Sequence, residues 1–122
     1  MKKTSFVLAI VMLFMLAACG NAGYKNVSPD EAKQLINQKD VTVLDVRTPE
    51  EFQQGHIPGA TLIPVQILDG SLGELDKNTA YLVVCRSGNR SEEASNILTS
   101  NGFTKVYNMT GGLNTWTFEM EQ

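Results

Sequence analysis

Apolar and polar positions divide the chain into a short N-terminal apolar run and a longer part in which strand and helix patterns alternate. Four short runs rich in β-branched and other apolar residues predict buried strands at 41–46, 61–63, 81–84 and 106–108. Segments with polar openings and helical spacing lie between these runs. Because strands alternate with helices, we expect an α/β fold with a mostly parallel central sheet and helices on both faces.

Capping residues mark where the helices begin. Ser28 is expected at an N-cap, with Pro29 at the first helical position and Glu31 completing a capping box. Residues 48–51 repeat this cap, proline and acid pattern. A further helix is expected over residues 91–101, where apolar residues recur on one face.

The N-terminal apolar run has the features of a secretory signal. It covers residues 6–18 after Lys2 and Lys3, and it is too short to span a bilayer. Its end, Leu-Ala-Ala-Cys-Gly at 16–20, resembles the lipobox of bacterial lipoproteins, which implies that Cys19 is lipidated. Ordinary signal cleavage, with a cysteine there by chance, is the alternative.

These features predict how the chain is divided and where it resides. Residues 1–18 are expected to be a lipoprotein signal peptide, and residues 19–26 a lipidated cysteine and short tether. The protein is then extracytoplasmic and lipid-anchored to the bacterial cell membrane through Cys19, because two acyl chains give stable anchoring.

Charge and cysteine content narrow the possible partners. Without residues 1–18 the chain has eight basic and thirteen acidic residues, a net charge of −5, which disfavours nucleic acid. With Cys19 lipidated, Cys85 has no partner for an internal disulfide and is expected to be a free thiol. No His or Cys cluster has zinc-site spacing, so neither a metal nor another cofactor is expected.

The strongest chemical signal is a cysteine that ends a predicted strand and is followed by a polar, cationic loop. Cys85 ends the run 81–84, and the loop after it is Arg86, Ser87, Gly88, Asn89 and Arg90. Two cations, inward-facing N–H groups and a helix N-terminus would lower the pKa of a thiol and bind an anion. Most cysteines at the end of a Val-rich strand are inert core residues, but packing alone requires no such loop. We therefore expect Cys85 to be the nucleophile and residues 86–90 to bind the substrate.

Several separate motifs resemble the rhodanese homology domain. They are Leu-Asp-Val-Arg-Thr-Pro-Glu-Glu-Phe at 44–52, Gly-His-Ile-Pro-Gly-Ala at 55–60, the loop 85–90, and Gly-Gly-Leu at 111–113 with Trp116. The likeness covers nearly all of residues 24–118, and a rhodanese-like domain is expected over residues 27–120.

The resemblance implies sulfur transfer. Cys85 would take the outer sulfur of a sulfane donor as a persulfide and pass it to cyanide, a thiol or another acceptor. Arg86 and Arg90 could hold a small anionic donor such as thiosulfate. Two successive displacements predict ping-pong kinetics.

Other polar residues near the predicted site are interpreted as supporting. Asp45 and Arg47 follow the strand 41–46, at the same sheet edge as Cys85, where they either form an ion pair or line the pocket; we favour the ion pair. His56 lies in a turn and is expected to be structural rather than a general base. Trp116, near Leu113, is expected to pack rather than to contact substrate.

Two other functions are considered. Related folds place Cys-x5-Arg loops around phosphate or arsenate, but Cys85 to Arg90 is Cys-x4-Arg, and Val84 stands where many such phosphatases have a histidine. A phosphatase or arsenate reductase is therefore disfavoured. A persulfide carrier or redox-sensing module that does not turn over is the main alternative, since an accessible thiolate without a resolving cysteine suits either role.

Overall fold

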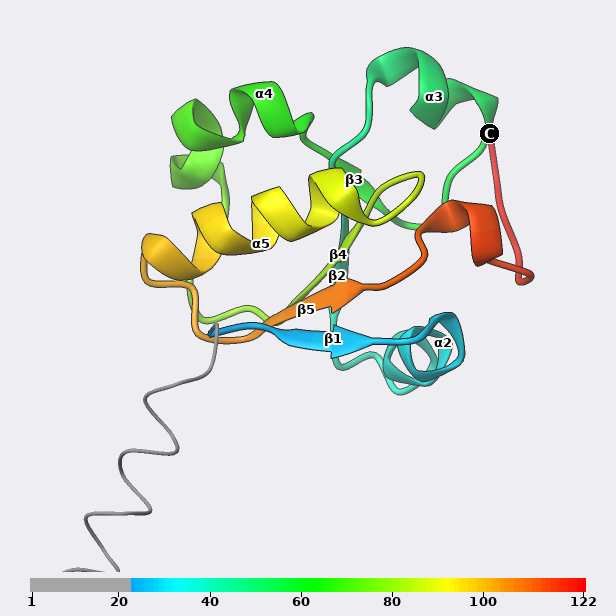
Figure 1. Ribbon diagram of the computed structural model, residues 1–122, viewed down its shortest axis with the longest axis horizontal. Coiled ribbons are helices and arrows are strands. Elements are labelled where there is room, and N and C mark those ends of the chain that lie inside the picture. Colours follow the sequence, from blue (N-terminus) through cyan, green and yellow to red (C-terminus); the bar gives the residue numbers. More distant parts are fainter. Residues whose placement is uncertain (1–22) are drawn as a thin grey trace, which may run out of the picture.

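The computed structural model describes residues 23–122, so the predicted signal peptide and Cys19 lie outside the described residues. In this part of the chain a sheet of five strands forms the centre, in the order β1-β5-β4-β2-β3 (Figure 1). The strands are β1 (Lys25–Val27), β2 (Thr42–Asp45), β3 (Thr61–Leu62), β4 (Tyr81–Val84) and β5 (Val106–Met109). Neighbouring strands all pair in parallel, which confirms the predicted fold class.

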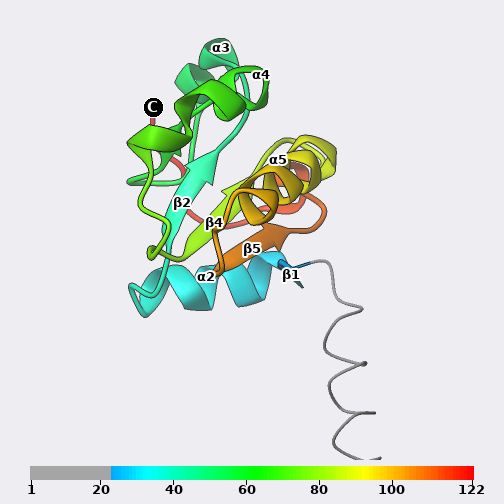
Figure 2. The same cartoon turned by 90° about the vertical axis from the view of Figure 1, so that its left-hand side faces the viewer.

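Helices cover both faces of the sheet (Figure 2). Helix α2 (Pro29–Asn37) lies on one face, and α4 (Val65–Leu68) and α5 (Asn89–Ser100) lie on the other (Figure 1). Helix α3 (Pro49–Gln54) follows β2, and the 3-10 segments η1 (Asp69–Glu74) and η2 (Leu113–Thr115) follow α4 and β5.

Successive side chains of β4 alternate between the two faces, as a strand requires. Val83 packs with Leu98 of α5 and with Phe103, whereas Leu82 and Val84 pack with Ala32 of α2. The sheet is thus buried on both faces, which explains the continuous apolar run at 81–84.

Both predicted capping boxes form. Ser28 Oγ accepts the N–H of Glu31 at 3.2 Å, and Glu31 Oε1 accepts the N–H of Ser28 at 3.2 Å. Thr48 and Glu51 make the same reciprocal pair, at 3.2 and 3.3 Å. The second box fixes the start of α3 directly after β2, and with it the position of Glu51.

Four elements differ from the expectation. Residues 25–27 form β1, although residues 25 and 26 were expected to be tether, because their backbone pairs with β5. Residues 65–74 form α4 and η1, where no element was predicted. Helix α5 begins at Asn89 rather than residue 91, because Gly88 turns the chain at a φ of 103°.

The C-terminal segment returns to the turn that follows α3. Glu121 pairs with His56 in an antiparallel bridge, with N–H···O distances of 2.8 Å in both directions. This bridge joins Glu121 to the rest of the described domain. Within residues 23–122 we find no helix whose length and apolarity would let it cross a membrane.

Candidate active site

The predicted site residues meet at the edge of the sheet where its parallel strands end. Asp45 of β2 lies beside Val84 of β4, so the segments that follow these two strands leave the sheet side by side. One segment leads to Arg47 and α3, and the other leads through Cys85 to α5. Ligands in open parallel sheets bind at this edge.

The sulfur of Cys85 is held by backbone N–H groups. Its Sγ accepts the N–H of Gly88 at 3.0 Å and that of Ser91 at 3.3 Å. Burial opposes ionisation, since Cys85 is 0% exposed, but hydrogen bonds from Ser91, Gly88 and Ser87 outweigh it and lower the pKa of Cys85. The site therefore favours a thiolate at the end of β4, and Cys85 is a free thiol.

The segment 111–114 packs against the Cys85 loop. Leu113 donates its N–H to the carbonyl of Cys85 at 2.8 Å, and Asn114 donates to the carbonyl of Arg86 at 3.0 Å. A Cβ added to Gly88 would lie 3.4 Å from the N atom of Gly111. The Gly-Gly-Leu sequence thus lets a second backbone pack against the loop.

Both arginines of the loop are bound to a carboxylate. Glu51 Oε1 accepts Arg90 Nη1 at 2.7 Å, and Glu51 Oε2 accepts Arg90 Nη2 and Arg86 Nε, each at 3.0 Å. The Arg90 guanidinium holds the pKa of Glu51 well below its usual range, and Arg86 and the Thr48 N–H add to this effect. Burial raises the pKa of Glu51 but does not outweigh these contacts. Glu51 in turn raises the pKa of Arg90.

Sequence reasoning did not include Glu51 among the site residues. Its capping box with Thr48 was visible in the sequence, but a capping box identifies only the local partner of a glutamate. The contacts with Arg86 and Arg90 depend on α3 lying over the Cys85 loop.

Asp45 and Arg47 form the expected ion pair. Arg47 Nη2 lies 2.8 Å from Asp45 Oδ2, and their side chains are 6% and 0% exposed. Arg47 also donates to the carbonyl of Gly55 at 2.8 Å, which ties the end of β2 to the end of α3. Arg47 lines a cavity as well.

That cavity, of about 250 Å³, lies beside the Cys85 loop. Its lining combines charged residues with apolar ones: Arg47, Glu51, Gln54, Gly55, Arg86, Leu113, Asn114 and Met120. Because Arg86 directly follows Cys85, the cavity gives a small molecule a place next to the loop.

Ser87 and Asn89 have exposed side chains. Ser87 is exposed and its backbone helps to lower the pKa of Cys85. Asn89 is exposed and lines a separate hollow of about 550 Å³ with Glu92 and Glu93. We therefore place the Asn89 side chain on the surface of α5, apart from the Arg86–Glu51–Arg90 cluster.

His56 and Trp116 occupy packing positions. His56 Nδ1 lies 2.8 Å from the carbonyl of Phe52, its ring stacks on that of Phe52 at 3.6 Å, and Nε2 lies 3.4 Å from Glu121 Oε1. The Trp116 ring packs edge-on against Phe118 with centroids 5.0 Å apart.

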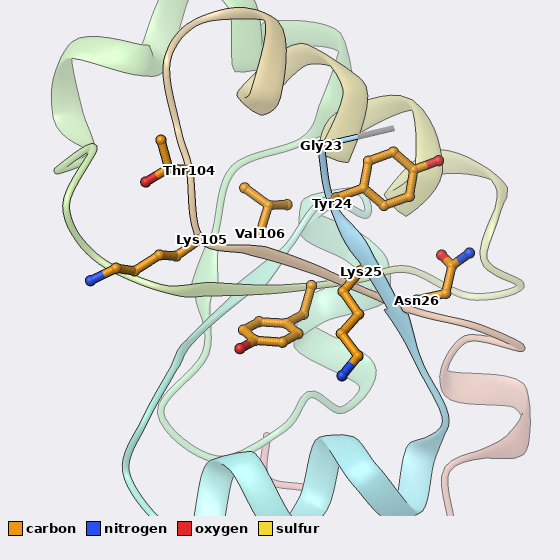
Figure 3. A pocket seen from close by; sticks show the side chains of 8 residues that line it. Gly23, Tyr24, Lys25, Asn26, Thr104, Lys105 and Val106 are labelled. Atoms are coloured by element: carbon orange, nitrogen blue, oxygen red, sulfur yellow. The ribbon is translucent and has the colours of Figure 1, made fainter. Parts of the chain in front are cut away.

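A larger hollow, of about 710 Å³, lies at the opposite edge of the sheet, where β1 and β5 begin (Figure 3). Tyr24, Lys25, Lys105 and Val106 are among its lining residues. Among residues 23–122 we find no group of three or more His, Cys, Asp or Glu side chains that could hold a metal ion.

The chain is similar to known proteins of one family. The family model of the rhodanese-like domain matches residues 28–119. A sulfurtransferase of Allochromatium vinosum is 35% identical over 85 residues, which cover 70% of this chain and 79% of the relative. The thiosulfate sulfurtransferase GlpE of Pseudoalteromonas translucida is 31% identical over 93 residues, 76% of this chain and 89% of the relative. YrkF, a proposed sulfur carrier of Bacillus subtilis, is 35% identical over 96 residues, and the match spans about half (52%) of its length.

Solved structures show the same fold. A rhodanese-like domain protein of Staphylococcus aureus is 37% identical with a TM-score of 0.73, over 80% of this chain and 96% of that one. A rhodanese-related protein of Thermoplasma volcanium is 30% identical with a TM-score of 0.75, over 80% of this chain and 98% of that one. The family model, the relatives and the solved structures agree, and the chain belongs to the rhodanese-like domain family.

Proposed function

We propose that this protein is a sulfurtransferase that carries a sulfane sulfur as a persulfide on Cys85. The observation that supports this most directly is the position of Cys85 Sγ, which accepts N–H groups of Gly88 and Ser91 at the start of α5. Such a site favours a thiolate before the reaction and can stabilise a persulfide anion after it.

In the first displacement the Cys85 thiolate attacks the outer sulfur of thiosulfate. The new bond joins Sγ to that sulfur, the S–S bond of thiosulfate breaks, and its electron pair leaves with sulfite. The Cys85 persulfide retains one negative charge and sulfite carries two, so charge is balanced and no external oxidant is needed. Cationic groups near the loop favour the departing sulfite.

In the second displacement an acceptor attacks the outer sulfur of the persulfide. Cyanide gives thiocyanate, and a thiolate gives a new persulfide; in both cases the electron pair of the broken S–S bond returns to Sγ as the thiolate. Covalent storage of the sulfur predicts ping-pong kinetics.

Intact mass of the domain before and after thiosulfate tests the proposal. We expect a gain of about 32 Da, one sulfur atom, in the wild-type protein and none in Cys85→Ser. Cyanide should then remove that mass and release thiocyanate. Release of thiocyanate only once per protein, without turnover, would indicate a carrier or sensor, and no gain with any sulfane donor would overturn the proposal.

We also propose that the chain is anchored outside the cytoplasm through a lipid on Cys19. The support lies in the sequence: a basic start, the apolar run 6–18 and the lipobox-like 16–20. Cys19→Ala should move the processed protein from the membrane fraction to the soluble fraction, because two acyl chains supply stable anchoring. A Cys19→Ala protein that stays membrane-bound after signal cleavage would contradict the anchor.

A further inference from the structure

The carboxylate of Glu51 occupies the position between Arg86 and Arg90 that an anionic substrate would be expected to use. Arg90 presents both terminal nitrogens to Glu51, at 2.7 and 3.0 Å, and Arg86 presents Nε at 3.0 Å. Arg90 thus binds the Glu51 carboxylate with two N–H groups, as arginines also bind oxyanions.

Glu51 is also fixed from its own side. Its Oε1 accepts the N–H of Thr48 at 3.3 Å and the hydroxyl of Thr48 at 3.1 Å, as part of the box that starts α3. Its side chain is only 15% exposed. Glu51 is therefore held in place by the start of α3 and by both arginines.

The charge of the cluster follows directly from these contacts. Two guanidinium groups and one carboxylate give a net charge of +1 beside Cys85, where the loop arginines alone would give +2. The electrostatic attraction between the cluster and an anion scales with the product of their charges. The carboxylate of Glu51 therefore weakens the attraction for a dianion more than the attraction for a monoanion.

We propose that Glu51 sets the charge of the preferred sulfur donor, disfavouring dianions such as thiosulfate relative to singly charged persulfides and thiosulfonates. This inference rests on the proposed sulfurtransferase activity and adds a specificity-determining residue to it. Glu51 acts through the arginines and not on the reacting sulfur.

Two donors with the same sulfonyl chemistry separate charge from reactivity. Thiosulfate is a dianion, and methanethiosulfonate is a monoanion that gives Cys85 its outer sulfur and leaves as methanesulfinate, with charge conserved. In Glu51→Gln we expect kcat/KM for thiosulfate, divided by that for methanethiosulfonate, to rise about fivefold. The rise should shrink as the salt concentration increases, because mobile ions screen the added charge.

The chain provides a matched control in Glu50, the exposed neighbour on α3. Glu50→Gln removes the same charge and should leave the donor ratio unchanged. Glu51→Asp keeps the charge on a shorter side chain, so its donor ratio should stay closer to that of the wild type than Glu51→Gln.

A measurement without turnover keeps this inference separate from the proposed function. Iodoacetate and iodoacetamide alkylate the same thiolate but differ by one negative charge. Glu51→Gln should raise the iodoacetate rate relative to the iodoacetamide rate by about fivefold, even in a protein that transfers no sulfur. Thermal unfolding of each variant shows whether it is folded.

The outcomes are distinct. A higher thiosulfate preference together with a higher iodoacetate preference, absent in Glu50→Gln, supports the inference. Equal decreases in kcat/KM for both donors and in the alkylation rates with both reagents would mean that Glu51 only shapes the loop, and would overturn the inference. An unchanged alkylation ratio in folded Glu51→Gln would also overturn the inference, whereas wild-type protein that takes no sulfur from either donor would overturn the proposed function alone.

Discussion

Gly112 packs directly against Arg86, so two segments distant in the sequence lie in backbone contact beside Cys85. A Cβ placed on Gly112 would lie 2.6 Å from the N atom of Ser87 and even closer to the carbonyl of Arg86. Gly112 also has a φ of 63°, a conformation that disfavours other residues. The shape of the Cys85 loop therefore depends on a residue that has no side chain.

Gly112→Ala should displace the loop and slow persulfide formation. The methyl group collides with backbone atoms, which cannot rotate away as a flexible side chain can. A shift of about 1 Å at the reacting atom can cost about a hundredfold in rate. The rate of mass gain at Cys85 with thiosulfate measures this loss.

The matched control is Gly73→Ala, because a Cβ on Gly73 would meet nothing within 4 Å. It should form the persulfide at the wild-type rate. Equal rates for Gly112→Ala and the wild type would show that the loop does not need this close approach.

The reactivity of Cys85 should persist to lower pH than that of an ordinary cysteine. Alkylation follows the thiolate, and the pKa of Cys85 is lowered in the folded protein, so the iodoacetamide rate should fall only as the pH drops through that lowered value. In urea the midpoint should return to about 8.5, the value of a free cysteine. If the folded and unfolded protein had the same midpoint, the pKa of Cys85 would not be lowered by the fold.

Asp45→Asn should strongly destabilise the domain. It removes the charge that compensates Arg47 in a pair whose side chains are 6% and 0% exposed, and an uncompensated buried charge costs about 3–5 kcal/mol of unfolding free energy. Urea unfolding measures the loss, with exposed Asp40→Asn as the control, which should unfold like the wild type. The double variant Asp45→Leu, Arg47→Met should regain part of the loss, because it removes both charges.

His56→Gln should lower stability but leave the persulfide chemistry intact. The variant loses the stacking on Phe52, the contact with Glu121 and the hydrogen bond between Nδ1 and the Phe52 carbonyl. A hydrogen bond contributes about 1 kcal/mol. The unfolding free energy should drop while the mass gain with thiosulfate keeps its wild-type rate. A stable His56→Gln protein that no longer gains mass would assign His56 a chemical role.

Much of the fold could be predicted from the sequence because local pattern and tertiary packing agree there. The runs 41–46 and 81–84 are rich in apolar residues because β2 and β4 are inner strands of a sheet that has helices on both faces. Ser28 and Thr48 were recognised as caps because a capping box is a local structure. The position of Cys85 at the strand end followed from these assignments.

The missed elements depend on contacts that a local pattern does not contain. Strand β1 is three residues long and begins with Lys25 and Asn26, so its pairing with β5 determines it. The segment 65–74 contains Gly70 and Gly73, and it is held by buried Leu68 rather than by helical spacing. The arginine contacts of Glu51 likewise require α3 and the Cys85 loop to be neighbours in space.

Because the strands are parallel, the start of β1 and Cys85 lie at opposite ends of the strands. Figure 1 shows the described chain entering β1 at the tail of the arrows, whereas Cys85 follows the head of β4. A domain held by its N-terminus therefore presents its reactive sulfur on the far side from the point of attachment. A sulfur acceptor can then approach from the side of the domain that faces away from whatever holds the N-terminus.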